Sequence, residues 1–412
     1  MIERDVVIIG AGPAGLACAT RLKEIGVNDV LLVEREKKLG GILNQCIHDG
    51  FGLHKFKESL TGPEYIDKYL EKLINYKVDI LSDTMVVNLF PDKSMILSGP
   101  WGREKIKAKV IVLAMGCRER TAGAIWLAGT RPAGIYTAGV AQRLMNIDNY
   151  MIGNEVVILG SGDVGLIMAR RLTLEGARVL MVLEKLPYSS GLPRNIVQCL
   201  EDYNIPLYLK TTVTKVHGKA RVEGVTYVKL DDEGKIIPNS EKFVKCDTLL
   251  LSVGLIPENE LSREAGIPIH PVTGGPIVDD TYQTNIEGVF AAGNVLHVHD
   301  LADWASMEGE LVAEFAKRYL EGSLPRSKNW IDVKAGEGIR YVLPHKISGK
   351  LDVNFLFRVS YPSRNRYIVI RDGNNRVIKR KRIINLHPAV MENIEVKAEE
   401  LKSAEKLEVM IE

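Results

Sequence analysis

Residues Asp5–Gly15 read DVVIIGAGPAG, and the same pattern returns at Glu155–Gly165 as EVVILGSGDVG. In each copy a β-branched run enters a glycine-rich turn, a segment of helical period follows, and a second apolar run comes next. The distance between the copies is far too long for a solenoid of stacked repeats. We therefore predict two similar α/β domains, each built on a strand–turn–helix–strand unit.

The three glycines of each turn have separate physical tasks. The first makes the tight turn out of the strand, and the second has no Cβ, so the backbone can approach a pyrophosphate. The third lets the helix pack closely on the strand, and the pyrophosphate then lies at the helix N-terminus, where N–H groups and the dipole favour negative charge. In this order they are Gly10, Gly12 and Gly15 in the first copy, and Gly160, Gly162 and Gly165 in the second.

An acidic residue ends the second apolar run of each copy. Glu34 lies 24 residues after Gly10, and Glu184 lies 24 residues after Gly160. A carboxylate there accepts hydrogen bonds from ribose hydroxyls and repels a 2′-phosphate. A lone glycine motif is weak evidence, but two copies with their acids in register indicate two dinucleotide-binding sites.

Composition sets the class of protein. With 412 residues the chain is long enough for two or three domains, and 46% hydrophobic with 26% charged residues is typical of a globular protein. We expect no signal peptide, because the first apolar run begins directly after residue 5, and no apolar run approaches the roughly 18 residues that span a bilayer. Abundant Lys and Glu with only four Gln favour a thermophilic source.

The five cysteines are scattered, and no two form a CxxC pair. This pattern argues against a disulfide framework and against a metal or iron–sulfur site supplied by this chain. We expect a reducing, cytoplasmic setting and no metal. The cysteines are Cys18, Cys46, Cys117, Cys199 and Cys246.

The chain resembles the two-dinucleotide-domain flavoproteins, the superfamily that contains glutathione reductase and thioredoxin reductase. Besides the two fingerprints, KKLGG at 37–41 matches the stretch where the family's chain turns under the flavin. VIVLAMG at 110–116 and TLLLSVG at 248–254 resemble the paired strands that link the domains. TNIEGVFAAGN at 284–294 resembles the late FAD motif that contacts the ribitol, with Asn294 in place of the usual Asp. An amide still hydrogen-bonds a ribitol hydroxyl.

The resemblance implies an α/β fold with two Rossmann-like domains, the first binding FAD and the inserted second binding NAD(P)H. It implies an FAD domain built from 1–115 and 247–323, a nucleotide domain at 116–246, and a small, mainly β module at 324–412. The helical pattern after Asp300 then faces the pyrimidine end of the flavin, where its dipole stabilises the anionic reduced form.

The implied cofactor-binding residues follow from these motifs. For FAD they are Gly10, Gly12, Pro13, Ala14, Gly15, Glu34, Arg35, Gly40, Gly41, Ala114, Gly116, Gly293 and Asn294. For the nicotinamide nucleotide they are Gly160, Gly162, Asp163, Val164, Gly165, Glu184, Lys185 and Gly254. Glu184 favours NAD(H) over NADP(H), and the alternative, NADP(H), would use Lys185 or Arg194 as the contact of the 2′-phosphate.

Other members pass electrons to a CxxxxC or CxxC disulfide, whereas this chain has a single Cys46 in LGGILNQCIHDGFGLHKF. A redox disulfide within the chain is therefore not expected. Cys46 is either a catalytic thiolate, with His48 or His54 lowering its pKa, or a small buried hydrophobe. His297, His299 and Asp300 lack a fourth metal ligand, so a polar lining of the flavin pocket is the better interpretation.

A closer resemblance concerns GILNQCIHDGFGL and AGTRPAGIYTAGVAQRL at 128–144. These stretches are similar to NAD-linked flavoprotein subunits of dye-linked proline dehydrogenases, opine oxidases, hydrogen cyanide synthases and glycerol-3-phosphate dehydrogenase complexes. By this analogy the chain moves hydride between NAD(H) and FAD and exchanges electrons with a second flavoprotein subunit, with a small redox subunit as a further partner, in an oligomeric assembly.

The C-terminal segment has its own charge. Residues 325–412 hold 18 Lys+Arg against 11 Asp+Glu, and their alternating runs predict strands with a hairpin turn at DGNN. A charged helix is expected in VKAEELKSAEKLEVMIE. The basic strip is a solvated surface or a docking site for an acidic subunit. Nucleic-acid binding is not expected, because no single-strand-binding motif accompanies the charge.

Three functions remain open. The first is an electron-transferring subunit of an NAD-linked dehydrogenase. The second is a self-sufficient NADH oxidase or peroxidase that uses Cys46. The third is a flavin-binding interaction protein in which NADH only shifts conformation. The missing internal disulfide and the basic tail favour the first.

Overall fold

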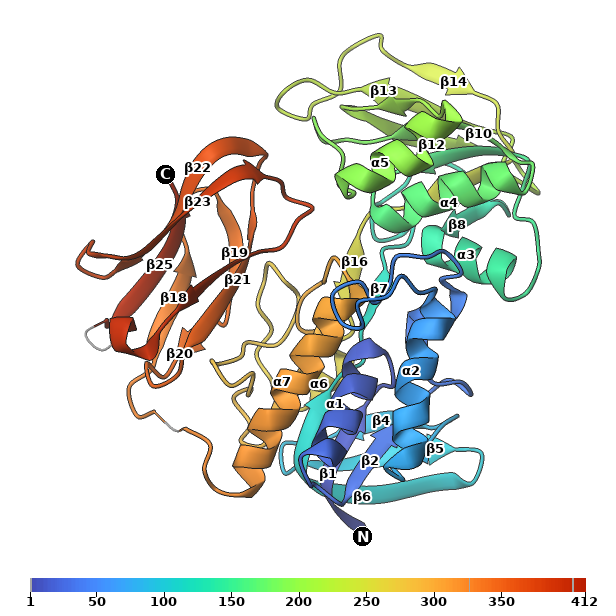
Figure 1. Cartoon of the computed structure of the whole chain (residues 1–412). Coiled ribbons are helices and arrows are strands. Elements are labelled where there is room, and N and C mark those ends of the chain that lie inside the picture. The colour runs from blue at the N-terminus through green and yellow to red at the C-terminus, as the bar shows by residue number, and fades with distance from the viewer. Residues whose placement is uncertain (1, 326, 402–403) are drawn as a thin grey trace. The chain divides into compact units, whose positions relative to one another are not determined.

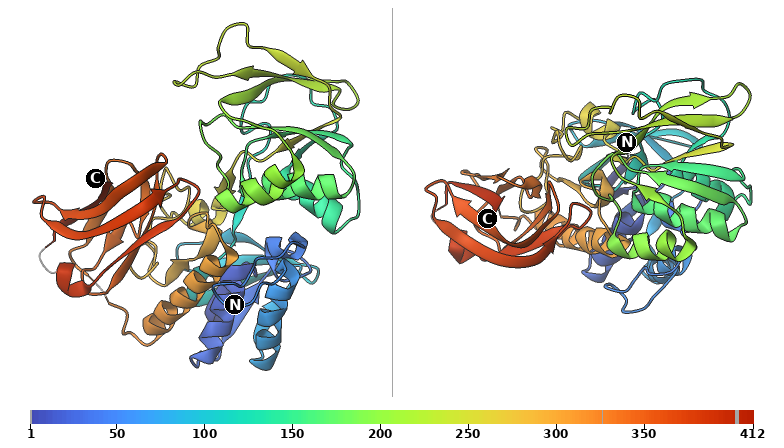
Figure 2. Two further views of the ribbon diagram at one scale, coloured as in Figure 1. Left: turned by 45° about the horizontal axis from the view of Figure 1, so that its top comes forward. Right: turned by 90° about the horizontal axis from the view of Figure 1, so that it is seen from above.

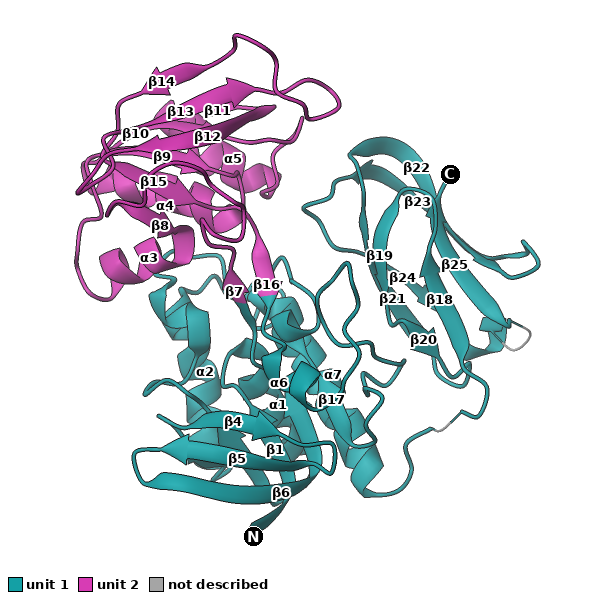
Figure 3. Ribbon diagram, turned by 180° about the vertical axis from the view of Figure 1, so that it is seen from behind, with its two compact units in different colours: residues 1–117, 257–412 teal, residues 118–256 magenta. Residues whose placement is uncertain are grey.

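The computed structural model describes residues 2–325, 327–401 and 404–412, and the chain forms two compact units (Figure 3). The first contains Met1–Cys117 and Pro257–Glu412, and the second contains Arg118–Ile256. The predicted fold class, Rossmann-like domains with a β-rich C-terminal part, is confirmed.

The first unit is centred on a sheet in the order β3-β2-β1-β6-β5-β4, with β17 also paired to β6. Strands β3, β2, β1, β6 and β17 run parallel, and β5 and β4 add an antiparallel edge. The central strands are buried on both faces, which explains their continuous apolar runs. Their bounds are β1 (Ile2–Ile9), β2 (Val30–Val33), β3 (Asp79–Leu81), β4 (Met85–Leu89), β5 (Ser94–Gly99), β6 (Gly102–Leu113) and β17 (Val289–Ala291).

Three helices lie side by side on this sheet in Figures 1 and 2: α1 (Pro13–Glu24), α2 (Gly62–Asn75) and α7 (Ala302–Leu320). Pro at the first positions starts α1, and a capping box between Thr61 and Glu64 starts α2. Helix α7 lies against α1 because Gly309 has no side chain. A Cβ there would lie 2.2 Å from the carbonyl oxygen of Ala14. The short elements are η1 (Gly41–Gln45), α6 (Glu260–Glu264) and η3 (Gly293–Val295).

The second unit repeats the plan with a parallel sheet in the order β11-β10-β9-β15-β8. A three-stranded antiparallel sheet, β12-β13-β14, completes it. The elements are β8 (Ile135–Thr137), α3 (Ala138–Asn146), β9 (Glu155–Leu159), α4 (Asp163–Leu174), β10 (Arg178–Leu183), α5 (Pro193–Cys199), η2 (Glu201–Tyr203), β11 (Leu207–Tyr208), β12 (Thr211–His217), β13 (Gly224–Lys229), β14 (Lys242–Val244) and β15 (Thr248–Leu251).

The sequence-based view of the linking strands needs a correction. The apolar runs at 110–116 and 248–254 do not pair with each other, because β6 and β15 each belong to the sheet of their own unit. The strands that do pair come directly after them, β7 (Cys117–Glu119) and β16 (Leu255–Pro257). The chain thus returns to the first unit at Pro257, ten residues after the expected 247, because β15 completes the second sheet.

The C-terminal module has two sheets, β20-β18-β25-β22-β23 and β19-β21-β24, which enclose one apolar core (Figure 2). The hairpin at DGNN is confirmed, between β22 and β23. The strands are β18 (Ile331–Ala335), β19 (Ile339–Leu343), β20 (Lys346–Ile347), β21 (Val353–Val359), β22 (Ser363–Asp372), β23 (Val377–Leu386), β24 (Glu392–Val396) and β25 (Lys406–Ile411), with η4 (Ala398–Leu401) before β25.

The terminal helix expected in this module is wrong. KLEVMI forms β25, which pairs with both β18 and β22, and Leu407, Val409 and Ile411 alternate into the core. The period-2 alternation of these apolar residues therefore outweighs the helical propensity of the charged residues before them. The module also shares the core of the first unit through Tyr341 and Leu343.

No helix in the described part of the chain is long and apolar enough to cross a membrane.

The contact between α1 and α7 gives a stability prediction. We expect Gly309→Ala to lower the free energy of unfolding by about 1–3 kcal/mol, because the new methyl overlaps the Ala14 carbonyl between two packed helices. Gly123→Ala is the control. A Cβ at Gly123 would have the Thr121 hydroxyl as its nearest neighbour, at 3.7 Å, which is an ordinary van der Waals contact. Chemical unfolding measures both, and an equal, small effect at the two positions would contradict the prediction.

Candidate functional site

The first glycine turn fits tightly beneath the neighbouring strand. Gly10 has a φ of +101°, and a Cβ there would lie 2.5 Å from the carbonyl oxygen of Ala114, so only glycine fits. The next residue, Ala11, donates its N–H to Oε2 of Glu34 at 2.7 Å. The other oxygen of that carboxylate accepts the N–H of Glu36 at 2.9 Å. The buried Glu34 is thus fixed at the turn, and each oxygen keeps capacity for a further donor.

The segments predicted for FAD converge on this turn. Gly40 donates its N–H to the Ala11 carbonyl at 2.8 Å. A Cβ on Gly41 would lie 3.3 Å from Cα of Gly12, and a Cβ on Gly293 would lie 2.8 Å from Cβ of Ala14. Ala14 and Gly293, which are 279 positions apart in the sequence, therefore belong to one site.

The turn has the shape that a pyrophosphate requires. Nothing in the protein lies within 4 Å of the position that a Cβ on Gly12 would take. Helix α1 begins there with Gly12 as its N-cap, and no side chain caps its first N–H groups. Free N–H groups and a helix dipole at an open glycine are the elements of an anion site. The first turn, Glu34 and the late motif together fit FAD.

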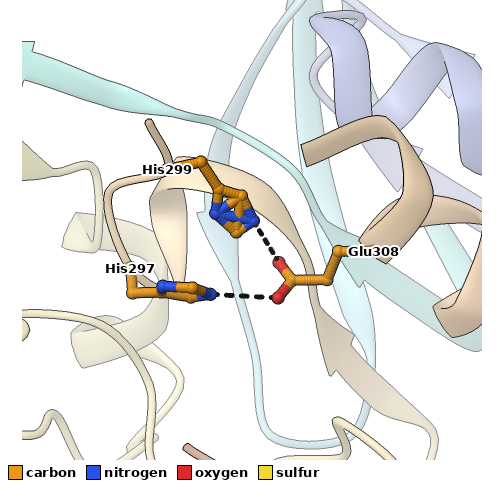
Figure 4. Close-up of side chains that lie close together, drawn as sticks. All are labelled: His297, His299 and Glu308. Atoms are coloured by element: carbon orange, nitrogen blue, oxygen red, sulfur yellow. Dashed lines mark hydrogen bonds and ion pairs between the residues drawn. The ribbon is translucent and has the colours of Figure 1, made fainter. Parts of the chain in front are cut away.

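A polar cluster lies directly behind the late motif. Figure 4 shows His297 and His299 facing the carboxyl group of Glu308, at 3.0 Å and 3.3 Å. The same carboxyl accepts the N–H of Gly293 at 2.6 Å. Burial raises the pKa of Glu308 to about 7 and lowers the pKa of both histidines to about 3. At neutral pH the imidazoles are therefore uncharged, and the carboxyl is poised between its two forms.

The cluster also resembles a metal site, because three ligand atoms lie within 4.8 Å of one another. Structural zinc sites use four ligands, and a ligating histidine usually donates its second ring N–H to an acceptor. Among the described residues only three ligands are grouped here, and Nδ1 of His297 is buried with no hydrogen-bond partner. A hydrogen-bonded lining is the interpretation that fits these contacts.

The surroundings of Cys46 favour the protonated thiol over the thiolate. It is buried, its Sγ lies 3.4 Å from the Ile42 carbonyl, and burial raises its pKa to about 12. The thiolate that a catalytic cysteine needs is therefore disfavoured. Cys117 contacts the late motif, with Sγ 3.5 Å from the amide nitrogen of Asn294. The five cysteines, all within the described residues, form no disulfide with one another.

The second unit repeats the turn with more hydrogen bonds around its acid. Oε2 of Glu184 accepts the N–H and the hydroxyl of Ser161 at 3.0 Å and 2.6 Å, and the hydroxyl of Ser190 at 3.1 Å. Oε1 accepts the N–H of Leu186 at 3.0 Å. Three donors fix one oxygen, and the other keeps capacity for a ribose hydroxyl.

Helix α4 follows this turn as α1 follows the first. Asp163 accepts the N–H of Leu192 at 2.8 Å and the side-chain amide of Asn195 at 2.6 Å, which joins the start of α4 to the start of α5. The Gly165 N–H donates to the Ser252 hydroxyl at 3.1 Å, at the end of β15. The start of α4 is thereby held close to the strand end, as a dinucleotide site requires.

Three of the predicted residues lie outside these hydrogen-bonded networks. Arg35, Lys185 and Gly254 are exposed. Other residues that shape the sites were missed: Ser161, Ser190, Ser252, Glu308 and Arg358. Ser161 follows Gly160 directly, and this position was a weak signal for its contact with Glu184. Glu308 gave no such signal, because an acidic residue on an amphipathic helix is ordinarily exposed to solvent.

Comparison with known proteins assigns the chain to a family through residues 4–309, which match the family described as pyridine nucleotide-disulphide oxidoreductase. The chain is 26% identical over 304 residues to the NAD(P)H sulfur oxidoreductase (CoA-dependent) of Pyrococcus abyssi, covering 71% of this chain and 63% of that protein. It is 26% identical over 301 residues to apoptosis-inducing factor 3 of Homo sapiens, covering 71% and 45%. The chain thus spans about half to three fifths of the length of these relatives.

Solved structures agree on the fold. Thioredoxin reductase of T. acidophilum superposes with a TM-score of 0.63 at 23% identity, covering 78% of this chain and 99% of that one. L-proline dehydrogenase of P. horikoshii superposes with a TM-score of 0.53 at 21% identity, covering 78% and 58%. At these identities the likeness concerns the fold.

The family match agrees with the geometry, because it spans both glycine turns, both buried glutamates and the late motif. The expected cofactor classes, FAD and a pyridine nucleotide, and the expected enzyme class are those of the family. The chain belongs to the pyridine nucleotide-disulphide oxidoreductase family.

Proposed function

We propose that this protein oxidises NADH, with FAD bound at the first glycine turn, and delivers the electrons to an acceptor outside this chain. One construction that is present in both units carries the proposal: a glycine turn before a helix, fixed by a buried glutamate at the end of the next strand. Two such sites in one chain fit two dinucleotides, between which a hydride passes.

The residues of the first unit bind and orient. FAD, when bound, supplies the ability to accept a hydride and release electrons singly or in pairs. The N-terminus of α1 holds the pyrophosphate, and Glu34 accepts ribose hydroxyls. Helix α7 begins after Leu301 with no side-chain cap, so its N–H groups and dipole favour negative charge in front of it.

The second site favours NAD(H) over NADP(H). Glu184 is buried, and its carboxylate accepts four hydrogen bonds, three of them from Ser161 and Ser190 and one from the N–H of Leu186. A 2′-phosphate beside this carboxylate would suffer charge repulsion. Lys185 and Arg194 are exposed, so neither forms a built phosphate site.

The acceptor is proposed to be a second flavoprotein subunit of a glycerol-3-phosphate or amino-acid dehydrogenase, in an oligomeric complex that can include a small redox subunit. The lack of a disulfide among the five cysteines supports an acceptor outside the chain. The fold likeness to an L-proline dehydrogenase chain is compatible with this placement.

A second candidate is reduction of a sulfur compound or of oxygen by the isolated chain. Two observations favour it: the contact between Cys117 and Asn294 of the late motif, and the similarity to an NAD(P)H sulfur oxidoreductase. The high pKa of Cys46 speaks against a role for that thiol.

One kinetic experiment separates these candidates. We expect the FAD-loaded protein to reduce an artificial dye rapidly with NADH, and oxygen, peroxide and polysulfide slowly. Cys46→Ser should leave dye reduction within about twofold, because a buried thiol contributes no thiolate. Steady-state rates with each acceptor measure this. Fast polysulfide turnover that is lost in Cys117→Ser would select the second candidate, and no bleaching of the flavin by NADH would defeat the proposal.

The coenzyme preference depends on Glu184. We expect Glu184→Ala to lower the ratio of kcat/KM for NADH to that for NADPH by about tenfold or more, since a charged hydrogen bond and a repulsive charge are lost together. Glu34→Ala is the matched variant at the first turn, and it should weaken FAD binding without changing that ratio. An unchanged ratio in Glu184→Ala would refute the assignment.

The buried Glu308 makes stability depend on pH. Its folded pKa of about 7 lies above the ordinary value of 4.5, so the folded state holds a proton between these values that the unfolded state has lost. The contribution of Glu308 to the free energy of unfolding is therefore fully present below pH 4.5. It declines as the pH rises towards 7, by up to about 1.4 kcal/mol per pH unit. His297 and His299 give the opposite slope, from their lowered pKa values.

Glu308→Gln isolates the contribution of this carboxyl group. We expect the difference in the free energy of unfolding between wild type and variant to fall as pH rises from 5 to 7, and to level off above pH 7. Urea titrations at pH 5, 6, 7 and 8 provide the measurement. A difference that stays constant, or that grows with pH, would show that the carboxyl is ionised throughout.

A further inference from the structure

One arginine of the C-terminal module is committed entirely to contacts inside the protein. Arg358 lies in β21, and its side chain is 11% exposed. On the module side, Nε donates to the hydroxyl of Tyr341 at 3.1 Å. Nη1 donates to the carbonyls of Pro388 at 3.1 Å and Ala389 at 2.6 Å. The rigid guanidinium fork therefore has a single orientation.

The remaining nitrogen reaches out of the module. Nη2 of Arg358 donates to the carbonyl of Val298 at 3.0 Å and forms a salt bridge with Asp300. The Asp300 side chain is 8% exposed, and it also accepts the N–H of Met391, a module residue. Arg358 and Asp300 thus form a buried ion pair that joins the module to the loop between η3 and α7.

That loop is the continuation of the late FAD motif. Asn294 accepts the N–H of His299 at 2.9 Å through Oδ1, so the loop orients the amide that is predicted to contact the ribitol of FAD. Gly293 donates its N–H to Glu308, which His297 and His299 face. Hydrogen bonds thus link Gly293, Asn294 and the two histidines within one short segment, and Arg358 holds the far end of this segment at Val298 and Asp300.

We infer that the C-terminal module is part of the FAD site, and that Arg358 is the positioning residue through which it fixes Asn294. The inference rests on the FAD site of the proposed function. Without the guanidinium, the Val298 carbonyl loses its donor, and the buried Asp300 carboxylate keeps the Met391 N–H but loses its counter-charge, which is strongly unfavourable. The loop would then rearrange towards water and carry Asn294 with it.

The contacts distinguish this role from plain docking of the module. A second contact to the core lies elsewhere: the N–H and hydroxyl of Ser348 donate to Asp280 at 2.8 Å and 2.7 Å. This contact holds the module to the first unit, but it is not part of the segment at Gly293–Asp300. A variant at Ser348 therefore loosens the same interface without touching the late motif.

Arg358→Met tests the inference in the full-length protein. We expect the Kd for FAD, measured by fluorescence on reconstituting apoprotein, to rise about tenfold or more, the size of one lost charged hydrogen bond. The visible circular dichroism of the bound flavin should change as well, because its protein environment is altered. Arg358→Lys retains the charge but cannot reach all four carbonyl and carboxylate acceptors, so its Kd should rise by a smaller factor.

Two control variants complete the set. Ser348→Ala weakens module docking, and Arg364→Gln removes an exposed charge from β22 of the same module. Both should leave the Kd for FAD within about twofold and the flavin spectrum unchanged, because neither touches the loop. An equal rise in Ser348→Ala would reduce Arg358 to a docking residue and overturn the inference.

Two further outcomes also bear on the role of Arg358. If Arg358→Met does not fold, Arg358→Lys replaces it, and an unchanged Kd and flavin spectrum in that variant overturn the inference. Failure of the proposed function looks different, because wild-type protein would then fail to bind FAD or to bleach it with NADH. If the wild type binds FAD and its flavin is bleached by NADH, while Arg358→Met has an unchanged Kd and flavin spectrum, only the role of Arg358 is overturned.

Discussion

Both units depend on one interaction, the hydrogen bond from the N–H after the first glycine to a buried glutamate. Ala11 donates to Glu34 in the first unit, and Ser161 donates to Glu184 in the second. The bond ties the turn after one strand to the end of the next, which leaves the following helix N-terminus open to an anion. A buried carboxylate without such donors would be costly, so the turn and the acid require each other.

The parts of the fold that local sequence could predict are those governed by this bond. Gly10 and Glu34 are recognisable because sterics admit only glycine at one position and ribose recognition selects an acid at the other. Helix prediction failed at the C-terminus, where β25 is a strand because β18 and β22 flank it. Such a tertiary effect leaves no local mark other than the alternation of three apolar residues.

The site residues that sequence reasoning missed share a different property. Glu308 is on a helix and Arg358 is on a strand, and each has a residue type that is ordinarily solvated. Glu308 and Arg358 are buried because of the elements that pack against them in the folded protein. The hydrophobic periodicity and the composition of the sequence do not reveal this packing. The predicted residues lie on the glycine turns and strand ends, whereas the missed Glu308 and Arg358 contact the Gly293–Asp300 segment through their side chains.

The basic strip of the module is weaker evidence for an acidic partner than its composition suggests. Arg358 pairs with Asp300, Arg371 with Glu412, and Lys379 with Glu400, so these charges are compensated within the protein. Paired charges contribute little to attraction at the distance of a Debye length. The contacts therefore support a role of the module within its own chain, through the buried Arg358 beside the late motif, better than a role in binding an acidic partner.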